Sequence, residues 1–123
     1  MPILETNARD AACNAIVDLI DSGGAGTLVF ETSADAAVAT INLNATAFGA
    51  SSTGTATLAG TPLSDTNANA GTVAQASFYN GSAAKVMECT VSTSGADINL
   101  SSLSVGAGDT VTVSSLTVTV PAS

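Results

Sequence analysis

The sequence predicts a mainly β protein with one short helix near its N-terminal end. The spacing of apolar residues changes near Gly26 from the helical period of about 3.6 to the strand period of about 2. After this change, turn-forming residues recur about every 8–12 residues, as they do in sandwiches and barrels. The 123 residues are 46% hydrophobic and 10% charged, whereas a disordered chain combines low hydrophobicity with high charge. We therefore expect one folded domain.

The helical spacing covers residues 8–21, directly after an apolar arm at residues 1–4. Thr6 or Asn7 can cap the start of the helix, and the glycines at 23–24 suit the left-handed conformation that often ends one. A polar stripe of Asp10, Asn14, Asp18 and Asp21 lies beside a wide apolar face of Ala12, Cys13, Ile16, Val17, Leu19 and Ile20. Because a helix this short is marginal alone, we expect its apolar face to pack on the β core.

Two strands are predicted at 27–31 and 37–43, because apolar residues alternate there on both sides of a short turn. Phe48 is an apolar anchor that precedes a weaker strand at 53–58, where Thr and Ala alternate. The longest loop is predicted at 61–71, which is rich in Pro, Asp, Asn and Gly.

A hairpin is the clearest local pattern in the sequence. Alternating segments at 72–79 and 82–91 flank Asn80-Gly81, a pair preferred in two-residue type I′ turns because both central residues need positive φ. This turn would place Phe78 opposite Ala83 and leave one face of the hairpin apolar. Such a two-faced hairpin is typical of an antiparallel sheet that covers a core on one side.

The C-terminal part of the chain predicts three further strands, at 97–100, 103–105 and 110–120. In the last of these, the apolar residues change parity at Ser114-Ser115. A β-bulge would cause this change, and so would a strand that crosses from one sheet to another.

These elements favour a jelly-roll-like antiparallel β-sandwich with one short N-terminal helix. Residues 1–24 would form the arm and a helix packed on the core, and residues 25–123 would form the sandwich, within a single domain. No internal repeat of about 20–50 residues is present, which argues against a solenoid.

Charge excludes two classes of partner. Ten carboxylates stand against only Arg9 and Lys85, which gives a net charge of −8. A nucleic-acid-binding protein needs a cationic surface to replace the counterions of phosphate, and binding to an anionic membrane surface requires the same.

No segment reaches the roughly 18 consecutive apolar residues of a membrane span, and the N-terminus lacks a signal-peptide pattern. We expect synthesis in the cytoplasm and binding to neither nucleic acid nor membrane.

The side chains predict neither catalysis nor a cofactor. The sequence has no histidine, so it has neither Ser–His nor Cys–His nucleophile pairs, and no Cys/His zinc set. Asp65, Asp97 and Asp109 follow or precede turn residues, where Asp commonly accepts hydrogen bonds from nearby backbone. Cys13 and Cys89 lie on apolar faces and are expected to be free, buried thiols. No metal ligand set is indicated, although a calcium ion held by loop carboxylates stays open as an alternative.

Several segments together resemble a family of known proteins. They are Asn-Ala-Arg-Asp-Ala-Ala at 7–12, Ser-Gly-Gly-Ala-Gly-Thr-Leu at 22–28, Ala-Phe-Gly-Ala at 47–50, Ser-Gly-Ala-Asp-Ile-Asn-Leu at 94–100 and Gly-Asp-Thr-Val-Thr-Val-Ser-Ser-Leu at 108–116. The chain resembles the small virion proteins encoded near the head genes of tailed bacteriophages. Some of these are jelly-roll capsid cement (decoration) proteins, which bind neighbouring major capsid proteins from outside the shell.

The resemblance implies a structural virion protein that assembles in the host cytoplasm and stabilises the capsid exterior. It also implies a homo-oligomer, with a dimer favoured over a trimer. The candidate contact residues are those of the N-terminal arm, Met1, Pro2, Ile3 and Leu4. Two alternatives stay open: a tail, neck or fibre-associated virion protein, and a binding module for glycans of the host surface.

Overall fold

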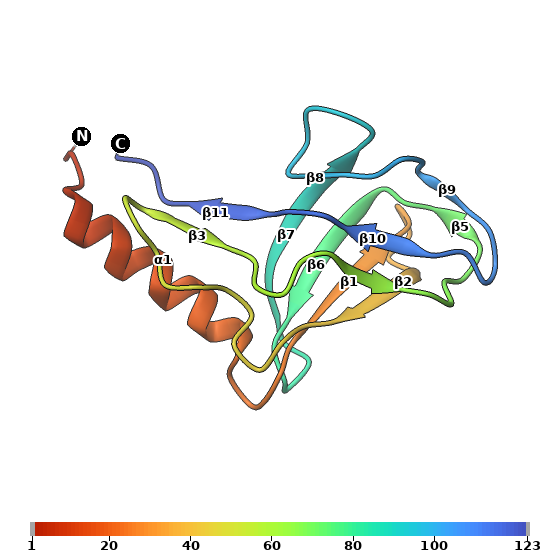
Figure 1. Ribbon diagram of the computed structural model, residues 1–123, viewed down its shortest axis with the longest axis horizontal. Coiled ribbons are helices and arrows are strands. Elements are labelled where there is room, and N and C mark those ends of the chain that lie inside the picture. The colour runs from red at the N-terminus through yellow and green to blue at the C-terminus, as the bar shows by residue number, and fades with distance from the viewer. Residues whose placement is uncertain (1, 123) are drawn as a thin grey trace.

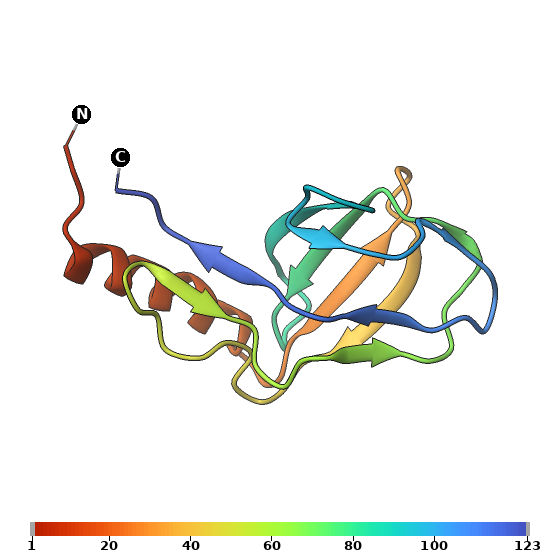
Figure 2. The same cartoon turned by 45° about the horizontal axis from the view of Figure 1, so that its top comes forward.

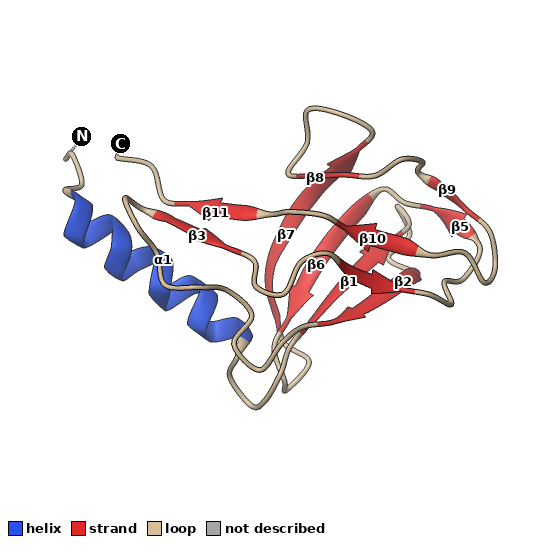
Figure 3. Ribbon diagram, in the orientation of Figure 1, coloured by secondary structure: helices blue, strands red, loops and turns tan. Residues whose placement is uncertain are grey.

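The computed structural model describes residues 2–122, and over this range the protein is mainly β with one helix (Figure 3). This confirms the coarse fold class predicted above. The elements are α1 (Thr6–Ile20), β1 (Thr27–Glu31), β2 (Ala37–Asn42), β3 (Thr55–Thr57), β4 (Leu63–Asp65), β5 (Gly71–Thr72), β6 (Gln75–Tyr79), β7 (Lys85–Ser92), β8 (Ile98–Asn99), β9 (Ser104–Val105), β10 (Val111–Val113) and β11 (Thr117–Thr119).

The helix starts two residues earlier than predicted, and its predicted N-cap is wrong, whereas Gly23 and Gly24 after its end have positive φ as predicted. Glu5 is the N-cap residue and makes no capping hydrogen bond through its side chain, while Thr6 and Asn7 lie inside α1. The backbone N–H of Leu4 donates to the carbonyl of Ala122 (2.7 Å). Glu5 has an extended backbone, so the helix begins directly after the arm that this tertiary bond holds.

The largest sheet has five strands in the order β2-β1-β6-β7-β8 and is curled (Figure 1). β1 pairs antiparallel with β2 and β6, and β6 pairs antiparallel with β7. The short β8 runs parallel to β7, which departs from a wholly antiparallel sheet. Leu28, Phe30 and Phe78 are fully buried on the inner face, as alternation in these strands predicts.

The β6–β7 hairpin exists, but its predicted register is wrong by four residues. Phe78 lies opposite Met87 and not Ala83. The connection is wider than two residues, because the N–H of Asn80 donates to the carbonyl of Ala84 (2.9 Å) and Ala83 has φ of 64°. This even shift leaves the side chains that pair with Gln75–Phe78 on their predicted faces, but an irregularity between Phe78 and Tyr79 moves Lys85 off its predicted face to a position opposite Tyr79.

Gly81 explains why the two-residue turn does not form. Its N–H donates to the carbonyl of Ser22 (2.9 Å), and a Cβ at Gly81 would lie 2.5 Å from the backbone of Gly23. The glycine is therefore needed for a close approach to the chain that follows α1, and its φ is not positive. The carboxamide of Asn80 instead accepts the N–H groups of Ser82 and Ala84, both at 3.0 Å.

Three two-stranded ladders complete the fold: β10 with β4, β11 with β3, and β5 with β9. The loop predicted at 61–71 is thus partly wrong, because β4 pairs with β10 within it. The last predicted strand is divided at Ser114-Ser115 between the β4 and β3 ladders. The change of parity therefore marks a crossing between ladders, the second of the two alternatives. The pairings do not by themselves show the two sheets of a jelly roll.

The helix is part of the same hydrophobic core as the strands. Cys13, Val17 and Ile20 are buried in it. The predicted apolar face is wider than the face that is buried, since Leu19 is 55% exposed. With 15 residues α1 is the only described helix, and no helix within residues 2–122 is long and apolar enough to cross a membrane.

The molecule has two regions. The curled sheet is one, and the other is a projection that we call the helix–ribbon unit, made of residues 2–20, 47–59 and 116–122. In this unit α1 lies against the β3–β11 ribbon and also contacts β7 of the curled sheet, and residues 2 and 122 lie at the far end of the unit from the sheet (Figure 2).

Candidate functional site

The predicted contact arm lies at the far end of the helix–ribbon unit. Met1 lies outside the described residues. Ile3 is 73% exposed and Leu4 is 40% exposed, so both apolar side chains face solvent, and Pro2 is exposed as well. The hydrogen bond between Leu4 and Ala122 holds the arm beside the C-terminal segment. The arm therefore presents its apolar side chains from a backbone that is fixed at one point.

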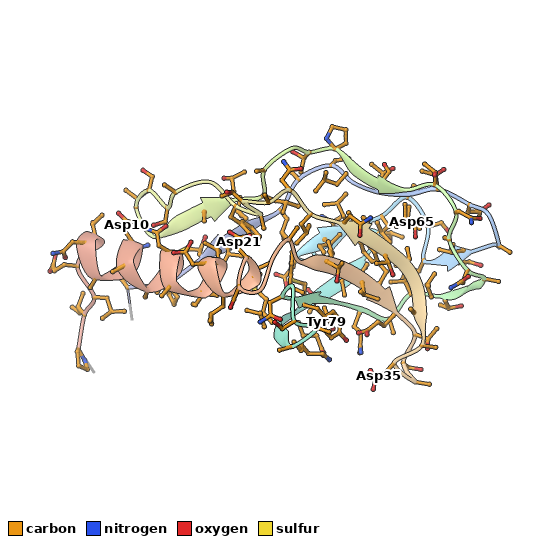
Figure 4. The ribbon with its side chains drawn as sticks, turned by 90° about the horizontal axis from the view of Figure 1, so that it is seen from below. Asp10, Asp21, Asp35, Asp65 and Tyr79 are labelled. Atoms are coloured by element: carbon orange, nitrogen blue, oxygen red, sulfur yellow. The ribbon has the colours of Figure 1, made fainter. Side chains whose placement is uncertain are left out.

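The polar stripe of α1 holds the segment before β3, and most of it does not face solvent as a polar stripe ordinarily would. Asp10 and Asp21 lie on the side of the helix that faces β3 and the chain leading into it (Figure 4). The bonds run from Ala47 N–H to Asp21 Oδ1 (2.9 Å), from Ser51 N–H to Asn14 Oδ1 (2.9 Å) and from Gly54 N–H to Asp10 Oδ1 (2.7 Å). Three side chains spaced along the helix thus fix an otherwise irregular segment.

Arg9 ties the helix to the last strand. Its Nε donates to the carbonyl of Val120 (2.9 Å), and a Cβ at Gly54 would lie 2.8 Å from that nitrogen. Gly54 has φ of 81°, a conformation that favours glycine. One of the two basic side chains of the sequence is therefore used to position the ribbon, which carries the chain end beside the arm.

The outer face of the β3–β11 ribbon consists of threonines. Thr57 lies opposite Thr117 and Thr55 lies opposite Thr119, and the hydroxyls of the second pair are 2.9 Å apart. Val118 points to the other face, where its carbonyl accepts the thiol of Cys13 (3.5 Å). Short, β-branched polar side chains lose little rotamer freedom on association, so this face can approach a partner closely.

A buried carboxylate that the sequence did not single out lies on the outer face of the curled sheet. Glu31 is only 4% exposed. Its oxygens accept hydrogen bonds from the hydroxyls of Ser77 and Tyr79, both at 2.8 Å, and from the amide of Gln75 at 3.4 Å. The signal that could have found it is a Glu at the end of an alternating strand, but the donors become evident only when β1 is paired with β6.

Burial is the largest single influence on the pKa of Glu31, but its hydrogen bonds and the charge of Lys85 together outweigh it. Burial by itself raises the pKa of Glu31, but the donors and the positive charge of Lys85 more than offset this, so the pKa lies below its ordinary value. The hydrogen bond to Glu31 raises the pKa of Tyr79. The Lys85 ammonium lies 5.9 Å from the centre of the Tyr79 ring. The cluster therefore contains an ionised carboxylate that is already satisfied by its neighbours.

A shallow hollow of about 430 Å³ adjoins this cluster and is lined by residues including Thr27, Thr40 and Asn80. The hollow has one aromatic residue, whose hydroxyl is engaged by Glu31. The side chains that line the hollow can hydrogen-bond a small polar group, and they do not point to a particular reaction.

The turn carboxylates hydrogen-bond the backbone, as the sequence predicts. Asp65, Asp97 and Asp109 each accept at least one backbone N–H. The donors are Asn67 (2.9 Å) and Thr40 (2.9 Å) for Asp65, Thr90 (3.0 Å) for Asp97 and Gly106 (2.8 Å) for Asp109. Within residues 2–122, no three Cys, Asp or Glu side chains are grouped so that they could hold a metal ion.

The two cysteines are free and buried, which confirms the prediction. Burial raises the pKa of Cys89 to about 11, with further contributions from the negative charges of Asp97 and Glu88. A thiol with so high a pKa is a poor nucleophile at neutral pH.

No protein-family model, curated protein or solved structure matches the chain. The arm, the threonine face and the Glu31 cluster are therefore the features from which a function can be inferred.

Proposed function

We propose that the chain is a non-catalytic structural protein of a tailed-bacteriophage virion. It acts as a jelly-roll-like capsid cement (decoration) protein that binds the major capsid protein on the exterior of the shell. The observation that supports this most is the exposed apolar arm, Ile3 and Leu4, held at the far end of a unit that projects from a well-packed β core.

The geometry of the arm suits a passive contact with another protein. Burying one such side chain fully stabilises a complex by about 1.5–3 kcal/mol. Because Leu4 is already bonded to Ala122, less conformational freedom is lost when the arm docks. A modest contact repeated by an oligomer and over many sites gives strong total binding through avidity.

Charge favours a protein partner of opposite sign. The net charge of −8 is carried by ten carboxylates, so the chain is attracted to basic surfaces. Arg9 is engaged with Val120, which leaves few cationic groups for phosphate. The proposal therefore includes neither nucleic acid nor a membrane as partner, and no cofactor.

A pair of matched variants tests the role of the arm. Ile3→Ser combined with Leu4→Ser should weaken binding to purified capsids at least about tenfold, because two apolar side chains are lost from the contact. Leu19→Ser is the control, since Leu19 is exposed and apolar but lies near the other end of α1. Equal binding by both variants, or a large fall in the melting temperature of the free double variant, would contradict this role.

The position in the particle separates the proposal from its alternatives. Quantitative mass spectrometry and low-resolution imaging of purified particles should find many copies spread over the shell. About six or twelve copies at one vertex would instead assign the chain to the tail, neck or fibre. Binding of the purified protein to a glycan array, with no binding to capsids, would favour a host-surface glycan module.

A further inference from the structure

The β10–β11 segment forms an unpaired sheet edge. β10 pairs only with β4, and β11 pairs only with β3. β3, in contrast, is flanked on both sides, because Gly49 donates its N–H to the carbonyl of Thr57 (3.0 Å) and Ser52 exchanges hydrogen bonds with Thr55 (2.9 and 3.0 Å). β11 is therefore the last strand of its ladder.

The direction of the unpaired backbone groups follows from the bonds on the paired side. Leu58 donates to the carbonyl of Leu116 (2.9 Å) and Val120 donates to the carbonyl of Gly54 (2.8 Å). Antiparallel ladders alternate between hydrogen-bonded and non-hydrogen-bonded pairs. The intervening Thr117 and Thr119 thus direct their N–H and C=O groups away from β3, toward the open edge.

Thr112 has the same direction in β10. Its hydroxyl lies 2.8 Å from that of Ser64 across the ladder, just as the hydroxyl of Thr119 lies 2.9 Å from that of Thr55. Such close side-chain contact is typical of non-hydrogen-bonded pairs, in which the backbone groups point outward. On this side β10 faces a hollow of about 340 Å³ whose far wall is the chain at 99–105, so a partner strand that pairs with β10 has to enter this hollow.

The β11 part of this edge lacks the features by which soluble proteins block edge pairing, whereas the β10 part faces the chain at 99–105 across the hollow. Natural edge strands carry Lys, Pro or inward-pointing charges, or they are covered. Residues 110–120 contain no charged residue and no proline. An edge of this kind is a template for the addition of another strand.

The sequence of the edge identifies the strand that fits it. Read outward in both directions from the point between Ser115 and Leu116, the segment is nearly a mirror of itself. The matched residues are Ser114 with Thr117, Val113 with Val118, Thr112 with Thr119, and Val111 with Val120. A second copy placed antiparallel would therefore set threonines against threonines on the outer face and valines against valines on the inner face.

We propose that β10–β11 pairs antiparallel with β10–β11 of a second copy, around a two-fold axis between Ser115 and Leu116. Both requirements of a ladder are met, because Thr112 and Thr119 share a face and both direct their backbone groups to the open edge. The interface is isologous, as a two-fold dimer needs. This inference rests on the proposed function, because it names the dimer contact of the proposed cement protein. Dimer formation is measured without capsids, so the absence of a dimer would not contradict capsid binding.

Cysteine cross-linking tests the register. Thr112→Cys and Thr119→Cys, mixed and oxidised, should form a disulfide-linked heterodimer, because directly opposite residues lie within the distance a disulfide spans. Either variant oxidised alone should give none, since neither position is opposite itself. The native thiols of Cys13 and Cys89 are buried and do not interfere in the folded protein. A dimer without this cross-link, or equal cross-linking by the single variants, would overturn the register.

Light scattering with two matched lysine variants tests the edge itself. The unmodified protein should be a dimer at about 100 μM, and Thr117→Lys should weaken it at least about tenfold. Thr57→Lys is the control, because Thr57 lies opposite Thr117 on the same face but in the flanked strand. Melting curves verify that both variants fold. A monomeric unmodified protein would overturn the proposal, and amide protection of the edge only on capsids would point to a capsid strand as the occupant instead.

Discussion

The curled sheet and the helix–ribbon unit share one hydrophobic core, but the unit depends more on polar side chains of its helix. In the sheet, Leu28, Phe30 and Phe78 are fully buried among other apolar side chains. In the unit, α1 contributes three buried residues and the ribbon segment buries Phe48 and Leu58. The irregular segment before β3 is held in addition by backbone N–H groups that donate to Asp10, Asn14 and Asp21.

From this difference we expect the two regions to differ in how easily they open locally. Apolar burial in a close-packed core resists local opening. A segment held by a few polar bonds opens at a lower free energy than the core. The unit carries the exposed arm, so the proposed contact lies on the region that opens more easily. The sheet is the more stable region. Phe48 and Phe78, with ring centres 5.7 Å apart, connect the two regions.

The largest expected effect comes from removing this connection on the sheet side. Phe78→Ala should lower the free energy of unfolding by about 3–5 kcal/mol, because a fully buried ring is replaced by a cavity. Chemical denaturation with two probes, one in each region, measures it. Phe78→Leu is the control and should cost much less. If only the probe in the helix–ribbon unit reported a loss of stability, the sheet would not be the region on which the stability of the whole molecule depends.

A smaller and local effect is expected from Asp10→Ala. The N–H of Gly54 would lose its acceptor, at a cost of about 1–3 kcal/mol, whereas the hydroxyl of Ser51 would keep the backbone carbonyl of Asp10. Hydrogen exchange should accelerate in residues 47–59 and stay unchanged in β6. Asp18→Ala, at an exposed position of the same helix, should change neither. Uniform acceleration over both regions would show that they do not open separately.

The Glu31 cluster predicts a pH dependence that belongs to the sheet. Because the pKa of Glu31 is lowered in the folded protein, its contribution is complete above the ordinary value of 4.5 and is lost as the pH falls through the lowered value. Glu31→Gln should therefore flatten the decline in unfolding free energy in acid, as measured by denaturation from about pH 6 to 3. Glu88→Gln, on the exposed side of β7, should leave most of that decline in place.

The labelling rates of the two native cysteines compare how often the two regions open, and no mutation is needed. Cys13 lies in the helix–ribbon unit and Cys89 in the sheet, and both are buried. A thiol reagent at pH 8 should therefore label each only after local opening, and Cys13 should react several-fold faster. Mass spectrometry of the labelled peptides measures the two rates. Faster labelling of Cys89 would reverse the order of stability inferred for the two regions.

The sequence by itself determined which residues form the helix and most strands, and which face of each strand is apolar. It also identified the arm, the free thiols and the backbone-bonding role of Asp65 and Asp109. These features follow from periodicity and turn chemistry, which act over a few residues.

Only the tertiary structure decided what these elements contact. The hairpin register depends on the approach of Gly81 to Gly23, and the acceptors of Glu31 find their donors only across β6. The polar stripe of α1 looks like a solvated face, yet Asp10 binds the backbone of Gly54, 44 residues away. Such contacts join residues far apart in the chain, so no local pattern of spacing or propensity encodes them.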